Sequence, residues 1–204
     1  MNRSLVRNVI FDFGGVLVRW QPEAVIASFY TDDALRERVR EAVIRHPDWV
    51  DIDRGTLSED TAIERFAARM QRPAAEMREL MRHIKDSLTA MPDTVALLEE
   101  LVQRGVPVYG LSNMSAPIFA LLRSRYDHWD RFRGIVISGE VGLVKPEPEI
   151  FHHITDCYSL IPAETVFIDD HLPNIESAGR LGFRTIHFAN AAQCRRELDT
   201  HIPR

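Results

Sequence analysis

Cysteine is scarce in this chain, and long apolar runs and blocks of basic residues are missing. The only two cysteines among 204 residues, Cys157 and Cys194, lie far apart, so we expect reduced thiols in a cytoplasmic protein. No apolar run approaches about 18 residues, the length that a transmembrane helix needs. The formal charge of −5 at pH 7 comes without a basic block, which argues against nucleic acid or a membrane surface as a partner.

Several catalytic signatures are also missing. The sequence contains neither a Gly-X-Ser-X-Gly elbow nor a Gly-X-Gly-X-X-Gly loop, which disfavours a serine hydrolase and a dinucleotide-binding protein. The eight histidines show no zinc-binding spacing with the two cysteines, and the adjacent His152 and His153 would diverge by about 100° on a helix. The first residues lead directly into an apolar run, so no signal peptide is expected.

The apolar pattern predicts two parts. Between 18 and 88, apolar residues recur at three- and four-residue spacing, which predicts helices at 22–30, 32–45, 59–70 and 73–88. From Pro92 onward, strands at 106–112, 134–138, 165–169 and 184–188 alternate with helices at 92–104, 115–126, 147–157, 172–181 and 191–199. This alternation predicts an α/β fold with a Rossmann-like, doubly wound parallel sheet. We expect residues 1–17 and 89–204 to form that core and 18–88 to form an inserted helical cap domain.

The most informative segment is the apolar run at 9–18, because it contains a single carboxylate, Asp12. A charge in a buried strand is costly to desolvate unless a cation, hydrogen bonds or a reaction uses it. The run is interrupted by Gly14 and Gly15, which let the backbone turn sharply and approach a ligand closely. Asp12 should therefore lie at the carboxyl edge of the sheet, where open α/β sheets bind their ligands.

Three later segments place polar groups at the ends of further predicted strands or in the loops between them. Ser112 and Asn113 precede a predicted helix, where they either cap that helix or bind an anion. Two prolines, at 146 and 148, follow Lys145 closely, and the lysine is either a solvated residue or a fixed cation. Asp169 and Asp170 follow an apolar strand, where they either favour the next helix electrostatically or bind a metal ion.

The four motifs, in this order, resemble those of the haloacid dehalogenase superfamily, whose members are mostly magnesium-dependent phosphatases acting through an aspartyl-phosphate. The resemblance covers nearly the whole chain, with the motifs between residues 9 and 174. It implies that Asp12 is the nucleophile and that Mg²⁺ is the cofactor. The implied metal ligands are Asp12, the main-chain carbonyl of Gly14 and Asp170, with Asp169 as a supporting or additional ligand.

The same resemblance assigns the remaining polar residues. Ser112 and Asn113 would hold the phosphoryl oxygens, and Lys145 would neutralise charge on the nucleophile and the phosphoryl group. Asn174 would fix the metal-binding loop by hydrogen bonds. His171, beside the acidic pair, is expected to be an exposed loop residue.

One position departs from the family pattern. Phosphatases of the family usually begin Asp-X-Asp, with the second Asp as general acid and base, and this chain has Gly14 there. The pattern Asp-X-Gly resembles a subgroup that includes bacterial sugar-1-phosphate phosphatases, whose acidic leaving groups depend less on enzymatic protonation. A 2-haloacid dehalogenase also lacks the second Asp, but such enzymes lack the paired carboxylates seen at Asp169 and Asp170. A catalytically silent member that binds phosphorylated ligands or another protein is the third alternative.

We therefore expect a magnesium-dependent phosphatase whose partner is a small phosphorylated metabolite, with sugar phosphates among the candidates. Specificity should lie in the predicted cap, because loops positioned by a scaffold commonly carry binding residues. The polar and aromatic candidates there are Trp20, His46, Trp49, Asp51, Asp53 and Arg54.

Overall fold

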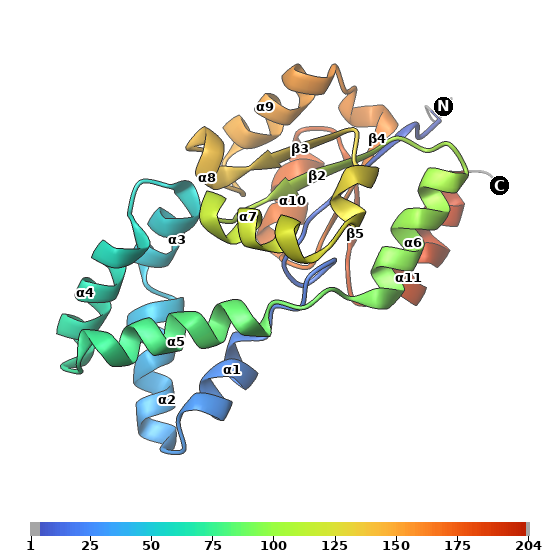
Figure 1. Cartoon of the computed structure of the whole chain (residues 1–204). Coiled ribbons are helices and arrows are strands. Elements are labelled where there is room, and N and C mark those ends of the chain that lie inside the picture. The colour runs from blue at the N-terminus through green and yellow to red at the C-terminus, as the bar shows by residue number, and fades with distance from the viewer. Residues whose placement is uncertain (1–4, 203–204) are drawn as a thin grey trace.

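The computed structural model describes residues 5–202. Five strands form one parallel sheet in the order β3-β2-β1-β4-β5 (Figure 1). Val9 of β1 lies opposite Val108 of β2 on one side and Val166 of β4 on the other, so β1 is the central strand. The strands are β1 Asn8–Phe11, β2 Val108–Ser112, β3 Gly134–Ile137, β4 Thr165–Asp169 and β5 Arg184–His187. The predicted α/β class with a doubly wound sheet is confirmed.

Helices cover both faces of the sheet because successive strand side chains alternate between two apolar clusters. Val9 and Phe11 belong to the cluster that includes side chains of α6 (Pro92–Gln103), α7 (Ala116–Arg125) and α11 (Ala191–His201). Ile10 belongs to the cluster that includes side chains of α9 (Pro148–Tyr158) and α10 (Leu172–Arg180). Strands buried on both faces explain the near-continuous apolar runs in the sequence.

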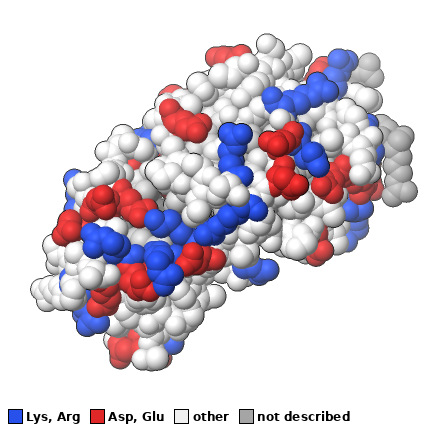
Figure 2. Space-filling model, in the orientation of Figure 1, with Lys and Arg blue, Asp and Glu red and all other residues white. Residues whose placement is uncertain are grey.

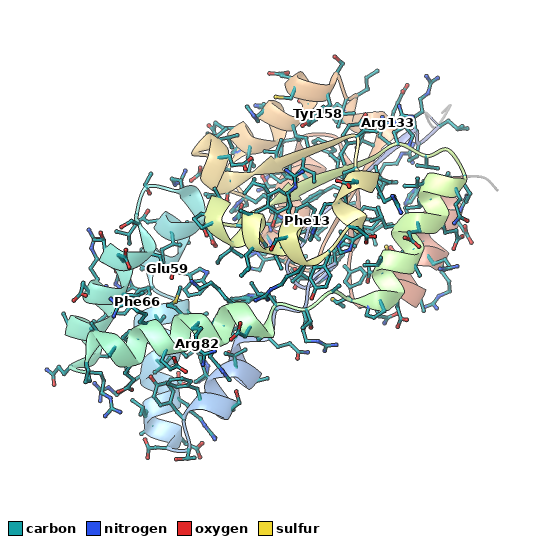
Figure 3. The ribbon with its side chains drawn as sticks, viewed as in Figure 1. Phe13, Glu59, Phe66, Arg82, Arg133 and Tyr158 are labelled. Carbon is teal, nitrogen blue, oxygen red and sulfur yellow. The ribbon has the colours of Figure 1, made fainter. Side chains whose placement is uncertain are left out.

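A second group of helices follows β1 and lies at one end of the sheet (Figure 1). Its members are α1 Pro22–Phe29, α2 Asp33–Val39, α3 Pro47–Arg54, α4 Glu59–Met70 and α5 Ala74–Ser87. They enclose their own apolar cluster, in which Phe66, Met77 and Leu80 are buried (Figure 3 labels Phe66). We call these five helices the cap. The two chain segments that join it to the sheet are hydrogen-bonded to each other, from Arg19 N to Thr89 O and from Met91 N to Leu17 O.

The structure differs from the predicted helices mainly in the cap. The single helix expected at 32–45 changes after Val39 into a π-helical turn, Arg40–Ile44. Helix α3 was not predicted, although Pro47 begins it and the left-handed Gly55 ends it. A short helix α8, Ser138–Val141, and two 3₁₀ turns, His128–Arg131 and Pro162–Glu164, also lie outside the prediction. These elements are too short to show a clear apolar period.

The surface and the helix lengths agree with the charge and hydropathy of the sequence. On the face in Figure 2, acidic and basic side chains are intermingled over the cap instead of forming a field of one sign. None of the helices in the described part of the chain has the length and apolar character that a membrane crossing requires.

Candidate active site

The polar motifs meet at one edge of the sheet because they follow three neighbouring strands. Asp12 comes directly after β1, Ser112 ends β2 and Asp169 ends β4. Since β2, β1 and β4 are adjacent and parallel, their carboxyl ends lie side by side. The topology therefore brings together residues that are more than 150 positions apart.

Packing of the residue after Asp12 fixes the loop that follows β1. The ring of Phe13 lies 4.7 Å from that of Trp129 and 5.7 Å from that of Phe119, measured between ring centroids (Figure 3 labels Phe13). The neighbouring strand makes room for it, because a Cβ atom at Gly110 would lie 2.4 Å from Phe13 Cζ. The backbone N–H of Phe13 donates to Asp12 Oδ1 at 2.6 Å. The Asp12 carboxyl is thus held in place from the core side.

Lys145 is the buried cation of the site. Its Nζ lies 2.8 Å from Asp12 Oδ1, 2.7 Å from Asp169 Oδ2 and 3.0 Å from the carbonyl oxygen of Leu111. Burial by itself would lower the pKa of Lys145, but Asp12 and Asp169 together raise it above its usual value. The ammonium group therefore remains charged, and it holds the Asp12 and Asp169 carboxylates close to each other.

The two carboxylates that contact Lys145 differ in their exposure and in their hydrogen bonds. Asp169 is fully buried and accepts hydrogen bonds from His171 N at 2.8 Å and from Asn174 Nδ2 at 3.0 and 3.1 Å. Asp12 lines the open cleft, and its Oδ2 receives no hydrogen bond from the described residues. Burial raises the pKa of Asp12, Lys145 opposes that rise and Asp169 adds to it. Asp169 therefore acts mainly on Lys145, whereas Asp12 keeps an oxygen for other partners.

A cluster of carboxylate oxygens suited to a hard divalent cation lies at this edge. Oxygens of Asp12, Asp169 and Asp170 lie within 4.8 Å of one another. Asp170 is the exposed member, and it packs against Gly15, where a Cβ atom would lie 2.1 Å from Asp170 Oδ2. Burial and the charge of Asp169 raise the pKa of Asp170. Oxygen ligands and excess negative charge fit Mg²⁺, which takes six oxygens and often keeps several waters.

Gly14 and Gly15 differ in their backbone conformation and in the space that a side chain would have. Gly15 has a left-handed φ of +76°, and its lack of a side chain lets the Asp170 carboxylate pack against it. Gly14 has no such φ, and a Cβ atom there would meet only Trp20 Cβ, at 3.8 Å. A side chain at position 14 is therefore compatible with the fold, and the missing carboxyl is not imposed by the backbone.

Ser112 and Asn113 have distinct surroundings. The Ser112 hydroxyl is buried and has no hydrogen-bond partner among the described residues. Because buried polar atoms are normally paired, an unpaired hydroxyl at the end of β2, next to the strand that leads to Asp12, indicates a place for a ligand oxygen. The Asn113 side chain instead exchanges two hydrogen bonds with the main chain of Lys145, at 2.8 and 2.9 Å, and so fixes the lysine loop.

A cleft of ≈ 350 Å³ opens above these groups, between the sheet edge and the cap. Of the six candidate specificity residues, Trp20, Trp49 and Asp53 line this cleft. The ring centroids of Trp20 and Trp49 lie 5.6 Å apart. Sequence reasoning missed the apolar part of the wall, which comes from separate segments: Val18, Ile44, Leu88, Met114 and Ile118. Those residues have no signal beyond ordinary hydrophobicity.

The other three candidates, His46, Asp51 and Arg54, are not among the residues that line the cleft. His46 caps α3, because its Nδ1 accepts from Asp48 N at 3.1 Å. The main-chain oxygen of Asp51 accepts from Thr56 N at 3.0 Å in the turn after α3. Arg54 forms a bidentate ion pair with Glu147, at 2.9 and 2.6 Å. These contacts lie at the start of α3, in the turn after it and between it and the core, respectively.

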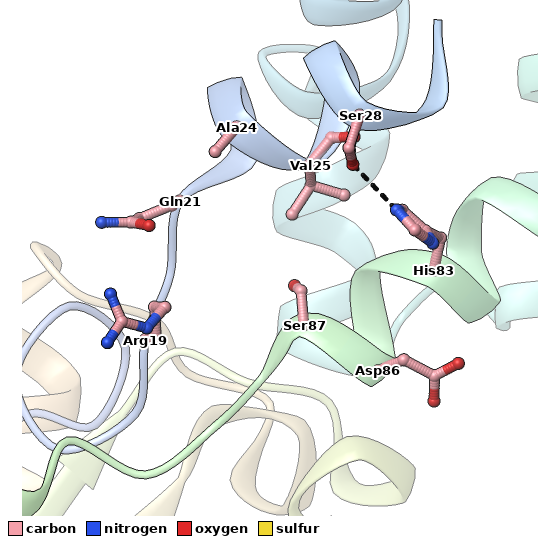
Figure 4. A pocket seen from close by; sticks show the side chains of 8 residues that line it. All are labelled: Arg19, Gln21, Ala24, Val25, Ser28, His83, Asp86 and Ser87. Atoms are coloured by element: carbon pink, nitrogen blue, oxygen red, sulfur yellow. Dashed lines mark hydrogen bonds between the residues drawn. The ribbon is translucent and has the colours of Figure 1, made fainter.

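A second cavity, of ≈ 330 Å³, lies where the cap joins the core (Figure 4). Ser28 Oγ and His83 Nε2 are 2.9 Å apart there, and Asp86 lies nearby. Asp86 instead bonds to Arg82 at 2.8 Å and to Arg125 at 3.4 Å, and the Ser28 hydroxyl donates to Val25 O. These contacts do not form the chain of hydrogen bonds that activates a serine nucleophile.

An aspartate after β1, a buried lysine and two consecutive aspartates at the end of β4 are the arrangement of one class of hydrolases. Residues 6–182 match the family of haloacid dehalogenase-like hydrolases, and the chain belongs to that family. It is 30% identical to the sesquiterpene phosphatase astK of Aspergillus oryzae, over 93% of each chain. It is 28% identical to the D-ribitol-5-phosphate phosphatase of Bacteroides thetaiotaomicron, over 95% of this chain and 97% of that one.

A solved structure shows the same architecture with ligands. It is a haloacid dehalogenase family enzyme from Bacteroides thetaiotaomicron in complex with magnesium and inorganic phosphate. Its TM-score is 0.73 and its identity 25%, with 89% of this chain and 93% of that chain covered.

Proposed function

We propose that this protein is a Mg²⁺-dependent phosphatase that hydrolyses a small phosphorylated metabolite through an aspartyl-phosphate on Asp12. The observation that carries the proposal is the arrangement around Lys145. This buried cation orients Asp12 with one oxygen free, close to the exposed carboxylate of Asp170, and the neighbouring strand β2 ends in the unpaired hydroxyl of Ser112. Two of the similar proteins are phosphatases, and the solved relative binds magnesium and phosphate.

The proposed roles follow from this geometry. Asp12, the main-chain carbonyl of Gly14 and Asp170 would hold Mg²⁺, which offsets the negative charge of the nucleophile and the phosphoryl group. Asp169 would position Lys145, and Asn174 would hold Asp169 by its two hydrogen bonds. The Ser112 hydroxyl would donate to a phosphoryl oxygen.

Lys145 would also contact the transferred phosphoryl group. It is a fixed positive charge beside the attacking oxygen, so it lowers the repulsion between a carboxylate and a phosphate dianion. The main chain around Asn113 would complete the phosphate site, while its side chain keeps Lys145 in position.

The cleft wall bears on the substrate class. A sugar phosphate, such as the ribitol phosphate named for one relative, needs hydrogen-bond partners for its hydroxyls. The wall here is largely apolar, with two tryptophans and several aliphatic side chains. It therefore favours a phosphate ester whose organic group is a hydrocarbon, the type named for the sesquiterpene phosphatase. A panel of terpenyl and sugar phosphates distinguishes the two classes.

We also propose the division of the chain into a core of 1–17 and 89–204 and a cap of 18–88. The separate apolar clusters of the sheet and of the cap helices support it. The outer ends of that division, 1–4 and 203–204, lie outside the described residues.

The test is Asp12→Asn, assayed by phosphate release from an aryl phosphate with Mg²⁺ and with a chelator. The amide is nearly isosteric but a far poorer nucleophile, so we expect turnover to be lost while the fold is retained. Beryllium fluoride should bind the wild type and not the variant. Residual activity within about tenfold of the wild type would contradict the aspartyl-phosphate mechanism.

The same assay tests the dehalogenase alternative. Chelator-resistant release of halide from 2-chloropropionate, without phosphate release from any ester, would reverse the assignment. A protein that binds phosphate esters without hydrolysing any of them would be the silent member.

A further inference from the structure

Apart from Asp12 itself, the loop after β1 carries no carboxyl that could protonate the leaving oxygen. Position 14, where phosphatases of the family usually carry an Asp, has no side chain here. Among the described residues that line the cleft, five are titratable. Three of them already have roles, Asp12 as nucleophile, Lys145 as its cation and Asp170 as a metal ligand. That leaves His171, in the exposed turn before α10, and Asp53, from the cap.

Asp53 is held over the core by the residues around it. Its main-chain oxygen accepts a hydrogen bond at 2.6 Å from the Ser138 hydroxyl at the end of β3. The next residue, Arg54, pairs with Glu147, two residues after Lys145. The one after that, Gly55, packs so closely that a Cβ atom would lie 2.7 Å from Gly139 O. Three successive cap residues are thus fixed on the core, which defines where the Asp53 side chain sits.

The Asp53 carboxyl is in a suitable protonation state. It makes no hydrogen bond or ion pair with the described residues, in contrast to Asp48 on the same helix, which pairs with Arg65 and Arg69. Burial raises the pKa of Asp53 to about 8, the charge of Asp12 contributes to that rise and Lys145 opposes it. The carboxyl therefore keeps its proton to a higher pH than an ordinary aspartate does, and it lines the cleft.

We propose that Asp53 is the general acid and base of this enzyme, supplied by the cap in place of the carboxyl missing at position 14. The proposal rests on the proposed phosphatase function. In the first step, an Asp12 oxygen forms a bond to phosphorus, the bond from phosphorus to the ester oxygen breaks, and the Asp53 proton moves to that oxygen to give the free alcohol. In the second, the Asp53 carboxylate takes a proton from water as the water oxygen bonds to phosphorus and the Asp12–phosphorus bond breaks.

The experiment compares Asp53→Asn with the wild type on two esters, an aryl phosphate and a primary alkyl phosphate. Release of the leaving group is followed in a single turnover, so that the first step is separated from hydrolysis of the phosphoenzyme. For the alkyl ester, whose leaving oxygen needs a proton, we expect a loss of about 10²–10⁴-fold. The aryl ester should retain its rate of release within about threefold, because its leaving group is acidic. Turnover after the first release should slow for both esters, because both form the same phosphoenzyme.

Two further variants separate acid catalysis from a structural effect. Asp60→Asn makes the same substitution at an exposed position at the start of α4 and should change neither ester's rate. The double variant Gly14→Asp, Asp53→Asn should recover much of the alkyl-ester rate, because position 14 has room for a side chain. In the wild type, the alkyl-ester rate should fall as pH rises above about 8, where Asp53 loses its proton.

Each outcome decides the proposal. Equal losses of release for both esters, or no loss for either, would overturn the role of Asp53 while leaving Asp12-dependent hydrolysis intact. If the wild type releases nothing from either ester with Mg²⁺, the phosphatase function itself is wrong, and the role of Asp53 fails with it.

Discussion

Replacement of Gly15 by alanine tests the proposed metal site through its steric limits. Gly15 has a φ of +76°, and an added Cβ atom would lie 2.1 Å from Asp170 Oδ2. Ordinary van der Waals contact begins at 3.4 Å, so the carboxylate must move by about 1.3 Å. Mg²⁺ requires oxygen ligands at about 2.0–2.1 Å in nearly octahedral geometry. A displacement of that size therefore moves the Asp170 carboxylate away from the place where it could bind one metal ion together with Asp12.

A matched variant separates this clash from backbone strain. Gly105 has nearly the same φ, +75°, but nothing lies within 4 Å of a Cβ atom there, and the residue is remote from the cleft. An alanine in the left-handed region costs about 1–2 kcal/mol, so both variants should lose at least that much free energy of unfolding. Only Gly15→Ala should also lose metal affinity. Loss of a ligand's support typically costs about 10–100-fold, and displacement of the ligand should cost no less.

Urea unfolding without Mg²⁺ measures the strain, and calorimetric titration with Mg²⁺ measures the metal affinity. We expect similar unfolding losses and a Mg²⁺ affinity that falls only in Gly15→Ala. If Gly15→Ala binds Mg²⁺ as tightly as Gly105→Ala, Asp170 is not a ligand in the arrangement described, and the metal site must be assigned to other oxygens.

Two further predictions follow from burial. Lys145→Met should lower the free energy of unfolding by about 3–5 kcal/mol at pH 8, because Asp12 and Asp169 then lack their buried cation. The loss should shrink at lower pH, where Asp12, whose pKa is raised by burial, takes up a proton. Urea unfolding at the two pH values measures this change, and a loss that does not depend on pH argues against charge as the cause. For the cysteines, burial raises the pKa of Cys194 to about 12, whereas Cys157 is exposed. A thiol reagent should therefore modify one cysteine in the native protein and two after unfolding, and rapid native reaction at both sites would contradict the burial of Cys194.

Much of the core was predictable because its signals are local. Strands buried on both faces give short apolar runs, and the amphipathic helices between them repeat every three to four residues. These patterns predicted the α/β class and the alternation after Pro92, and both are confirmed by the sheet order. The same periodicity predicted the helix at 59–70, which the structure has as Glu59–Met70.

Short elements in the cap were less predictable. Helix α3 has only eight residues and four charged side chains, so its start at Pro47 and its end at Gly55 were the only signals available. The widening into a π-helical turn after Val39 leaves the apolar spacing of the sequence almost unchanged. A local pattern therefore could not indicate where these helices end.

The sequence by itself determined which chemical groups this protein has: a carboxylate in an apolar run, a lysine followed by two prolines, a pair of aspartates and no carboxyl at position 14. Those are properties of residue types and of their places along the chain. Only the tertiary structure decided which groups meet. Parallel pairing of β2, β1 and β4 brought Lys145 between Asp12 and Asp169, and contacts of α3 with the core placed Asp53 in the cleft wall. Burial, which raises the pKa of Asp53, arises from segments distant in the chain and has no signature in the local sequence.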